Sequence, residues 1–161
     1  MWARMVLCVA ALGACGNGAS GDLSGLVVVN GGSAEFASNC ELQRVDSTGN
    51  GPGFGIDATD RNSDSGIFGV SLVWAAADVP GPGTYDIGLV GSPVAGFFAR
   101  PHPTESSTVR LSSIDEGQVR FDDYDPETQI TGALLGLRMD RDDEDETIAI
   151  EMPDASFVCE R

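Results

Sequence analysis

The sequence predicts an all-β protein, an antiparallel β-sandwich of about eight or nine short strands. Apolar residues recur at every second position in several short segments, which is the period of a half-buried strand. Turn-forming residues separate these segments, in a chain with 21 Gly and 8 Pro. Helical spacing is scarce: the segments 71–79 and 132–139 are rich enough in Ala and Leu for short helices, but Gly69, Gly132 and Gly136 argue against them. A closed antiparallel β-barrel is the alternative for the same pattern.

The N-terminal half contains the clearest predicted strand. Segment 26–29 is apolar and β-branched, and Asn30-Gly31-Gly32 after it is a turn signal. Segment 40–45 alternates, whereas the glycine-rich run 49–55 has neither a lysine nor a following helix and is predicted as a loop. From Ile67 to Trp74 the apolar residues fall on one face at period two: Phe68, Val70, Leu72 and Trp74.

The C-terminal half continues the alternation. A Pro-Gly-Pro-Gly turn at residues 80–83 leads into segment 84–90, and segment 109–112 also alternates. A turn at residues 115–117 precedes segment 118–121, in which Val119 and Phe121 are expected to point inward. The acidic segment 122–125 is predicted to be a solvated loop. The remaining predicted strands are 130–139, 147–152 and 155–159.

The chain is strongly acidic. It has 25 Asp and Glu against nine basic residues, all of them arginine, for a formal net charge of −16. Such a surface repels nucleic acid, which is therefore not expected as a partner, and it disfavours binding to anionic lipid headgroups. Solubility is the simplest explanation for the acidic surface.

The first fifteen residues have the parts of an export signal. Arg4 precedes an apolar run, Met5 to Leu12, of eight residues, whereas a membrane-spanning helix needs about 20. Small residues follow, and the stretch Leu12-Gly13-Ala14-Cys15 resembles the processing site of bacterial lipoproteins. The resemblance implies cleavage before Cys15, a diacylglycerol on its sulfur and an acylated new amino terminus. Three acyl chains (palmitate or similar) would anchor the mature protein to a membrane.

The same resemblance implies the domain organisation and the localisation. Residues 1–14 are expected to be a lipoprotein signal peptide, 15–24 a flexible tether and 25–161 a single β-domain. Gly16, rather than Asp, follows the cysteine, which in the enterobacterial sorting rule implies the outer membrane. The C-terminal half is also weakly similar to small uncharacterised β-domain lipoproteins of Gram-negative bacteria. The similar segments are Gly83-Thr84-Tyr85, Gly117-Gln118-Val119, Ile130-Thr131-Gly132 and Ser156-Phe157-Val158-Cys159.

Two cysteines remain outside the leader and the lipid site, Cys40 and Cys159. An even pair in an exported chain is typical of a disulfide, which here would link two residues far apart in the sequence. A zinc site is disfavoured, because the single histidine, His102, lies between two prolines with no cysteine nearby in the sequence.

A calcium loop is the main alternative to a plain β-domain. Asp60, Asn62 and Asp64 have the alternate spacing by which a loop can aim oxygens at one Ca²⁺ ion. However, Ser65 and Ser71 stand where an EF-hand loop has its glycine and its glutamate. A solvated loop whose Asn and Asp side chains bond their own backbone explains the same residues, and this interpretation is favoured.

Other candidate chemistry is weaker. The acidic run 140–146 lies between two predicted strands and is expected to be a charged hairpin tip, with a loose divalent-cation site as the alternative. No serine lies in a Gly-x-Ser-x-Gly elbow, and no carboxylate pair stands out by spacing. Trp74 and Tyr85 are expected to fill the core rather than to form a sugar-stacking platform.

The sequence therefore predicts a lipid-anchored domain of the cell envelope with a binding or structural role, no catalysis and no cofactor. The alternative is a calcium-dependent module, which could bind carbohydrate. An envelope hydrolase is a third alternative and is disfavoured.

Overall fold

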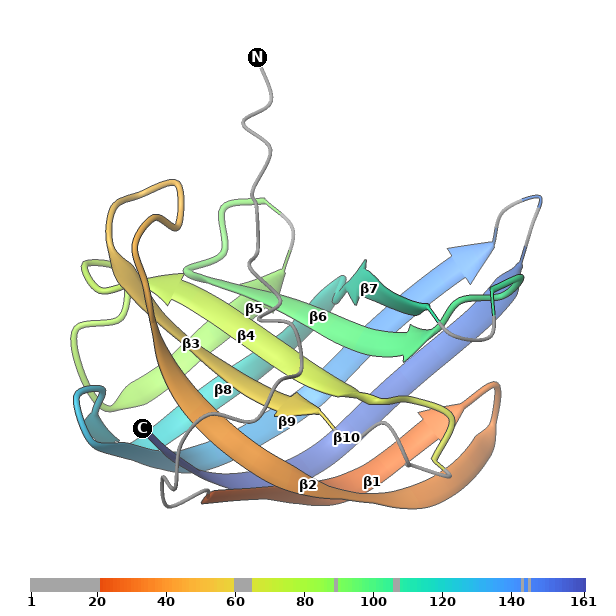
Figure 1. Ribbon diagram of the computed structural model, residues 1–161, viewed down its shortest axis with the longest axis horizontal. Coiled ribbons are helices and arrows are strands. Elements are labelled where there is room, and N and C mark those ends of the chain that lie inside the picture. Colours follow the sequence, from red (N-terminus) through yellow and green to blue (C-terminus); the bar gives the residue numbers. More distant parts are fainter. Residues whose placement is uncertain (1–20, 60–64, 89, 106–107, 143, 145) are drawn as a thin grey trace.

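The computed structural model describes residues 21–59, 65–88, 90–105, 108–142, 144 and 146–161 (Figure 1). These residues form strands and connecting turns and contain no helix. The ten strands are β1 (Gly21–Val29), β2 (Gly32–Val45), β3 (Gly53–Thr59), β4 (Gly69–Ala75), β5 (Gly83–Gly88), β6 (Val94–Pro101), β7 (Val109–Ser113), β8 (Glu116–Asp125), β9 (Gln129–Asp142) and β10 (Thr147–Glu160).

The strands pair into one sheet in the order β4-β3-β2-β1-β10-β9-β8-β5-β6-β7. β4 also pairs with β6, so the sheet joins onto itself. The ladders are antiparallel except for two parallel contacts of one residue pair each, β5 with β6 and β2 with β10. Figure 1 shows β3, β4 and β6 crossing in front of β8, β9 and β10, with the core between the two layers. The prediction of an all-β protein is confirmed, with ten strands rather than eight or nine.

The predicted turn after the first strand is confirmed. Val29 pairs with Gly32, and the two residues between them, Asn30 and Gly31, have φ angles of 49° and 83°. Positive φ at both central residues is what a two-residue type I′ hairpin requires, and Asn-Gly is its preferred sequence. Asn30 also bonds Ala149 of β10 twice: its N–H donates to the Ala149 carbonyl and its Oδ1 accepts from the Ala149 N–H.

The predicted boundary between tether and domain is wrong by four residues. β1 begins at Gly21, so residues 21–24 belong to the sheet, where Leu23 is fully buried. The segment is small and polar because Asp22 and Ser24 occupy the outward positions of an alternating strand. The tether predicted for residues 15–24 therefore ends by residue 20; residues 1–20 lie outside the described part of the chain.

Two strands were not predicted, β3 and β6. The glycines of β3 led to the prediction of a loop, because a strand interior normally contains few glycines. Gly53 is needed where β3 approaches β4: a Cβ at this position would lie 1.9 Å from the Trp74 carbonyl oxygen. All seven residues of neighbouring β4 are buried, which explains its continuous apolar character; the short helix considered for residues 71–79 is not formed.

The acidic segment 122–125 is part of β8 rather than a loop. Tyr124 packs against the core, and its hydroxyl accepts a hydrogen bond of 2.8 Å from the indole N–H of Trp74. Phe121 lies between these aromatic side chains, with ring centroids 5.2 Å from both Trp74 and Tyr124. Asp122 and Asp123 are exposed on the same strand. Local charge suggested a solvated loop here, whereas aromatic contacts between β4 and β8 hold the segment in the sheet.

The two C-terminal segments form one strand, β10, which continues across Pro153. Pro153 has no partner residue in either ladder of the described strands: the β9 ladder passes from Met152 to Asp154, and the β1 ladder shifts register between Gly25 and Val28. A proline can occupy a central strand where the ladders are interrupted in this way, because its missing N–H is not needed. Residues 132–139, the other segment considered for a helix, belong to β9.

Candidate functional site

The predicted disulfide is present and joins the middle of β2 to the C-terminal end of β10. Cys40 of β2 and Cys159 of β10 are bonded, with 4.7 Å between their Cα atoms, and both are fully buried. They lie where β1 begins: Gly21 pairs with Cys40, and beyond that point β2 and β10 meet directly through Glu41 and Glu160. A Cβ on Gly21 would lie 1.8 Å from the Val158 carbonyl oxygen, so the strands β1, β2 and β10 lie very close together here.

The other residues singled out from the sequence for binding are outside the described residues. These are Cys15, the predicted lipid site, and Asp60, Asn62 and Asp64, the calcium candidates. Within the described ranges, no group of three or more His, Cys, Asp or Glu side chains is arranged to hold a metal ion. The calcium alternative therefore gains no geometric support.

The acidic run 140–146 lies where β9 and β10 form a hairpin, as predicted, but its first three residues are the end of β9 at Asp142, and β10 begins at Thr147. Glu146, however, is not a solvated tip residue. Its side chain is only 10% exposed and lies between two arginines of the neighbouring strands. The sequence analysis missed this role, because the acidic neighbours of Glu146 suggested solvent for the whole run.

Arg100 is the most deeply buried charged residue of the described chain, with 2% exposure. It lies on β6 at even spacing from Val94 and Phe98, which are fully buried, so its side chain points into the interior. Its Nε donates to the hydroxyl of Ser112 on β7 at 2.8 Å. Its Nη1 and Nη2 donate to the two oxygens of Glu146, a bidentate pair.

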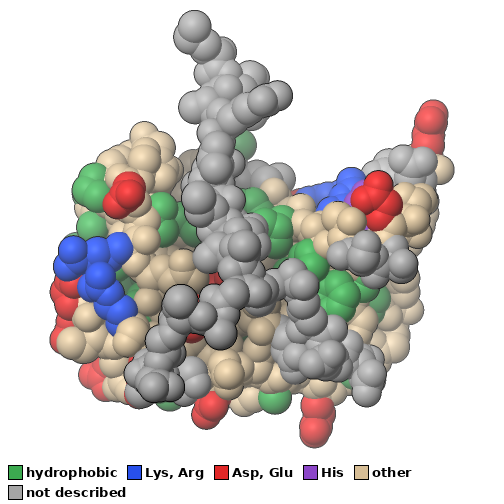
Figure 2. Space-filling model, in the orientation of Figure 1, with side chains coloured by type: hydrophobic (Ala, Val, Ile, Leu, Met, Phe, Trp, Pro, Cys, Tyr) green, Lys and Arg blue, Asp and Glu red, His purple; other side chains and the backbone are tan. Residues whose placement is uncertain are grey.

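A second arginine shares the same carboxylate. Arg110 of β7, 39% exposed, donates from Nη1 to Glu146 Oε1 at 3.1 Å. We call Arg100, Arg110, Ser112 and Glu146 the arginine cluster. It has two positive charges and one negative charge, and it connects β6 and β7 to the tip of the β9–β10 hairpin. Figure 2 shows basic and acidic side chains close together on this side of the molecule.

A further ion pair joins the same strands. Arg141 of β9 donates to both oxygens of Asp115 at 2.9 Å and to the Ser113 carbonyl at 2.7 Å. Asp115 in turn accepts the backbone N–H of Asp140 at 2.9 Å. Side chains rather than a backbone ladder therefore connect β7 to the end of β9. This arrangement positions strands and leaves no group in it aimed at a substrate.

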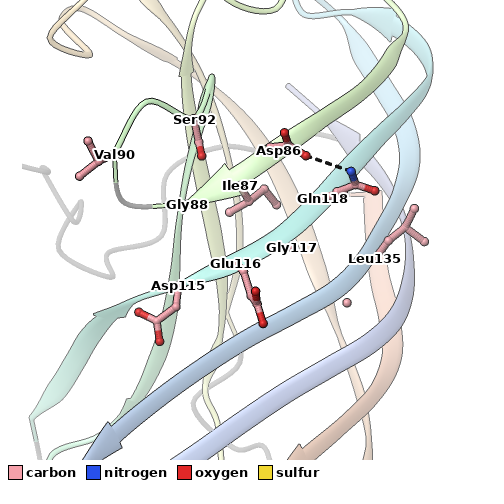
Figure 3. A pocket seen from close by; sticks show the side chains of 11 residues that line it. Asp86, Ile87, Gly88, Val90, Ser92, Asp115, Glu116, Gly117, Gln118 and Leu135 are labelled. Carbon is pink, nitrogen blue, oxygen red and sulfur yellow. Dashed lines mark hydrogen bonds between the residues drawn. The ribbon is translucent and has the colours of Figure 1, made fainter.

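A groove of about 640 Å³ lies beside β5 and the start of β8. Figure 3 shows its polar residues: Asp86 accepts a hydrogen bond of 2.9 Å from Gln118, and Asp115 and Glu116 lie at the opposite side. Asp115 is already paired with Arg141. The groove is open rather than enclosed.

Three more residues were considered for zinc or sugar binding: His102, Trp74 and Tyr85. His102 is half-buried, and its Nδ1 accepts a hydrogen bond from the Thr104 N–H at 3.3 Å. Trp74 is 1% exposed, which confirms the prediction that it fills the core. Tyr85 packs partly against the same core and donates its hydroxyl to the Gly81 carbonyl at 2.8 Å. The two rings do not form an exposed platform for a sugar.

Asp57 of β3 has a pKa that its surroundings raise. Burial raises the pKa above its usual value of 3.8, a hydrogen bond of 3.0 Å from Ser71 opposes the rise, and the charge of Glu41 adds to it. Glu41 and Ser71 are the residues that pair with Asp57 across the β2–β3 and β3–β4 ladders. The charged form of Asp57 is therefore unfavourable in the folded protein.

Asp57→Asn is expected to remove a pH-dependent loss of stability. Because the pKa of Asp57 is raised in the folded protein, the native state keeps a proton at pH values where the unfolded state has released it. The contribution of Asp57 to the free energy of unfolding is therefore complete below pH 3.8 and is lost as the pH rises through the folded pKa. In urea denaturation from about pH 3 to pH 7, the free energy of unfolding of the variant should rise relative to that of the wild type. The rise should be about 1.4 kcal/mol for each unit by which the folded pKa is raised. Glu41→Gln should reduce the effect, and a difference that does not vary with pH would contradict this assignment.

No family model, curated protein or solved structure matches this chain. The described residues include no helix that is long and apolar enough to cross a membrane.

Proposed function

We propose that this protein is a lipid-anchored module of the cell envelope with a binding or structural role and no catalysis. Cys15 would be its lipid attachment site, after removal of residues 1–14, and the outer membrane would be its location. The observation that carries the proposal is the Cys40–Cys159 disulfide.

Disulfides form and persist in oxidising compartments outside the cytoplasm. The bridge uses both cysteines of the β-domain; of the remaining two, Cys8 lies in the predicted leader and Cys15 is the predicted lipid site. A buried bridge thus supports export, and the stretch Leu12-Gly13-Ala14-Cys15 supports lipidation as the form that export takes. The disulfide belongs to the folded domain and the stretch Leu12-Gly13-Ala14-Cys15 to the N-terminal sequence, so each supports the proposal independently of the other.

The first strand begins six residues after Cys15, at Gly21. Even a fully extended segment of that length spans only about 20 Å. The start of β1 would therefore lie close to the membrane surface, and a binding role would be directed to partners at or near that surface.

A role without catalysis is supported by how the polar residues are used. Arg100, Arg110 and Arg141 are paired with carboxylates, and the open groove beside β5 contains no paired acid and base. An enzyme of this size would need reactive groups converging in a concave pocket with perturbed pKa values. Asp57, whose pKa is raised by burial, accepts a hydrogen bond from Ser71 and does not line the groove.

The proposal is tested by the intact mass of the membrane-extracted protein, with and without reductant. We expect a chain that starts at Cys15 and carries acyl groups, and that gains two hydrogen atoms on reduction. Cys15→Ser should abolish labelling with radioactive palmitate and release the protein from the membrane fraction. Cys8→Ser is the matched control and should leave labelling unchanged. An unlabelled wild-type protein with an intact leader would overturn the proposal.

A further inference from the structure

β7 is an open edge in an otherwise joined sheet. Among the described strands, β7 alone has a single ladder neighbour, β6. Two backbone hydrogen bonds at its ends show which residues face β6. The His102 N–H donates to the Thr108 carbonyl, and the Ile114 N–H donates to the Gly96 carbonyl. Backbone groups alternate along an antiparallel strand, so residues 108, 110, 112 and 114 face β6 and residues 109, 111 and 113 face away.

Few of the backbone N–H and C=O groups of β7 that face away from β6 have a hydrogen-bond partner among the described residues. The Ser113 carbonyl accepts a hydrogen bond from Arg141, whereas no backbone partner for Val109 or Leu111 is found on that side among the described residues. Among the described strands, the end of β9 pairs with β10 and not with β7. Unpaired N–H and C=O groups in a row are a template for another strand.

The surroundings of this edge indicate what kind of strand would fit. A hollow of about 650 Å³ is lined by half-buried Val109 and Leu111 together with His102, Pro103 and Thr104. Arg110 contributes to the same hollow, and apart from its single bond to Glu146, its N–H groups have no partner in the described chain. Apolar side chains and a positive charge therefore alternate along β7.

We propose that β7 binds an extended peptide segment of another envelope protein, which adds to the sheet as a strand with alternating apolar and acidic residues. In a ladder, residues that pair directly have their side chains on the same face. Apolar side chains of the peptide would lie against Val109 and Leu111, and an acidic side chain would lie against Arg110. Backbone hydrogen bonds supply the affinity in such additions, and the alternate side chains supply the specificity.

The charge distribution favours this partner over a second copy of the chain. Two copies, each with a net charge of −16, repel one another. The charge at the edge itself is different: Arg100, Arg110 and Glu146 together have one net positive charge, and the adjacent Arg141–Asp115 pair is neutral. The acidic residues of the neighbouring loop and of the β9–β10 hairpin tip, Glu105, Asp142 and Glu144, are exposed. The inference deepens the proposed function and rests only on its binding role, not on lipidation.

The test uses the full mature chain and two synthetic peptides of about eight residues, one alternating valine with glutamate and one alternating valine with lysine. Binding is measured by calorimetry, and amide hydrogen exchange reports protection at Leu111. Leu111→Pro removes an N–H that the β6 ladder does not use, so the fold should be retained, as melting by circular dichroism will verify. Leu111→Ala is the matched control, because it shortens the side chain and keeps the N–H.

We expect the glutamate peptide to bind and to slow exchange at Leu111, and the lysine peptide to bind at least about tenfold more weakly. Leu111→Pro should weaken binding by about tenfold or more, and Leu111→Ala by less than about threefold. Arg110→Gln should remove the preference for glutamate. If Leu111→Pro unfolds the protein, Val109→Pro answers the same question, since its N–H also faces away from β6.

Three results would overturn the inference: equal effects of Leu111→Pro and Leu111→Ala, tighter binding of the lysine peptide, or no binding of either peptide. Self-association that Leu111→Pro abolishes would assign the edge to a second copy instead. Failure of the proposed function has a different signature: a wild-type protein that takes up no palmitate would overturn lipid anchoring and leave peptide binding by β7 unchanged.

Discussion

Removing the Cys40–Cys159 disulfide should lower the free energy of unfolding by about 4 to 5 kcal/mol. The bridge closes a loop with a sequence separation of 119 residues, and cross-linking so long a loop restricts the unfolded chain strongly. Its position matters as well, because β2 and β10 otherwise meet through a single residue pair at this end of the sheet. A domain of this size has a total stability of about 5 to 15 kcal/mol, so the loss would be a large part of it.

The double variant Cys40→Ala/Cys159→Ala, compared with the wild type in urea denaturation, measures this effect. Alanine is chosen because both sulfurs are buried and a hydroxyl there would need a partner. Reduced wild-type protein should resemble the variant closely. If the two alanines lowered stability by less than about 1 kcal/mol, the bridge would not be a main source of stability.

Glu146→Gln should lower the free energy of unfolding by about 3 to 5 kcal/mol, because it leaves buried Arg100 without its counter-charge. Arg100 is 2% exposed and cannot recover its hydration, and Glu146 is its only carboxylate partner in the described chain. The variant keeps the shape of the side chain, so the loss measures charge rather than packing. Thermal or urea unfolding gives the value.

Two controls separate this effect from a general loss of charge. Asp122→Asn removes one member of an exposed pair, in which Arg120 and Asp122 are 48% and 53% exposed, and should change stability by less than about 1 kcal/mol. Replacing Arg100 by Met and Glu146 by Leu together should recover most of the loss, because apolar side chains need no counter-charge. A loss from Glu146→Gln as small as that from Asp122→Asn would contradict the assignment of a buried ion pair.

Much of the strand structure could be predicted where a strand has one buried face. Val119 and Phe121 of β8 are buried as their alternation indicates, and Asn30-Gly31 forms the predicted hairpin turn. The prediction failed where the pattern was interrupted for a reason elsewhere in the molecule. Gly53 is a glycine because the neighbouring strand passes close to it. Pro153 is tolerated because the β1 ladder shifts register beside it and the β9 ladder does not pair it.

The arginine cluster had a weak signal in the sequence. Arg100 follows Val94 and Phe98 at even spacing, so its position on the buried face of β6 could have been inferred once the strand was recognised. Its partner could not be inferred, because Glu146 is 46 residues away within a run of acidic residues. The same holds for β7: only the order of the strands shows that it lacks a second neighbour.

The sequence by itself determined the all-β class, the pairing of the two domain cysteines and the predicted lipid site at Cys15. These depend on local spacing, on composition and on counting, which a linear chain displays directly. Only the tertiary structure decided which charges are buried, where β1 begins and which strand edge stays open. Each of these depends on what lies beside a residue in space, and in a sheet that joins strands from both ends of the chain, those neighbours are far apart in sequence.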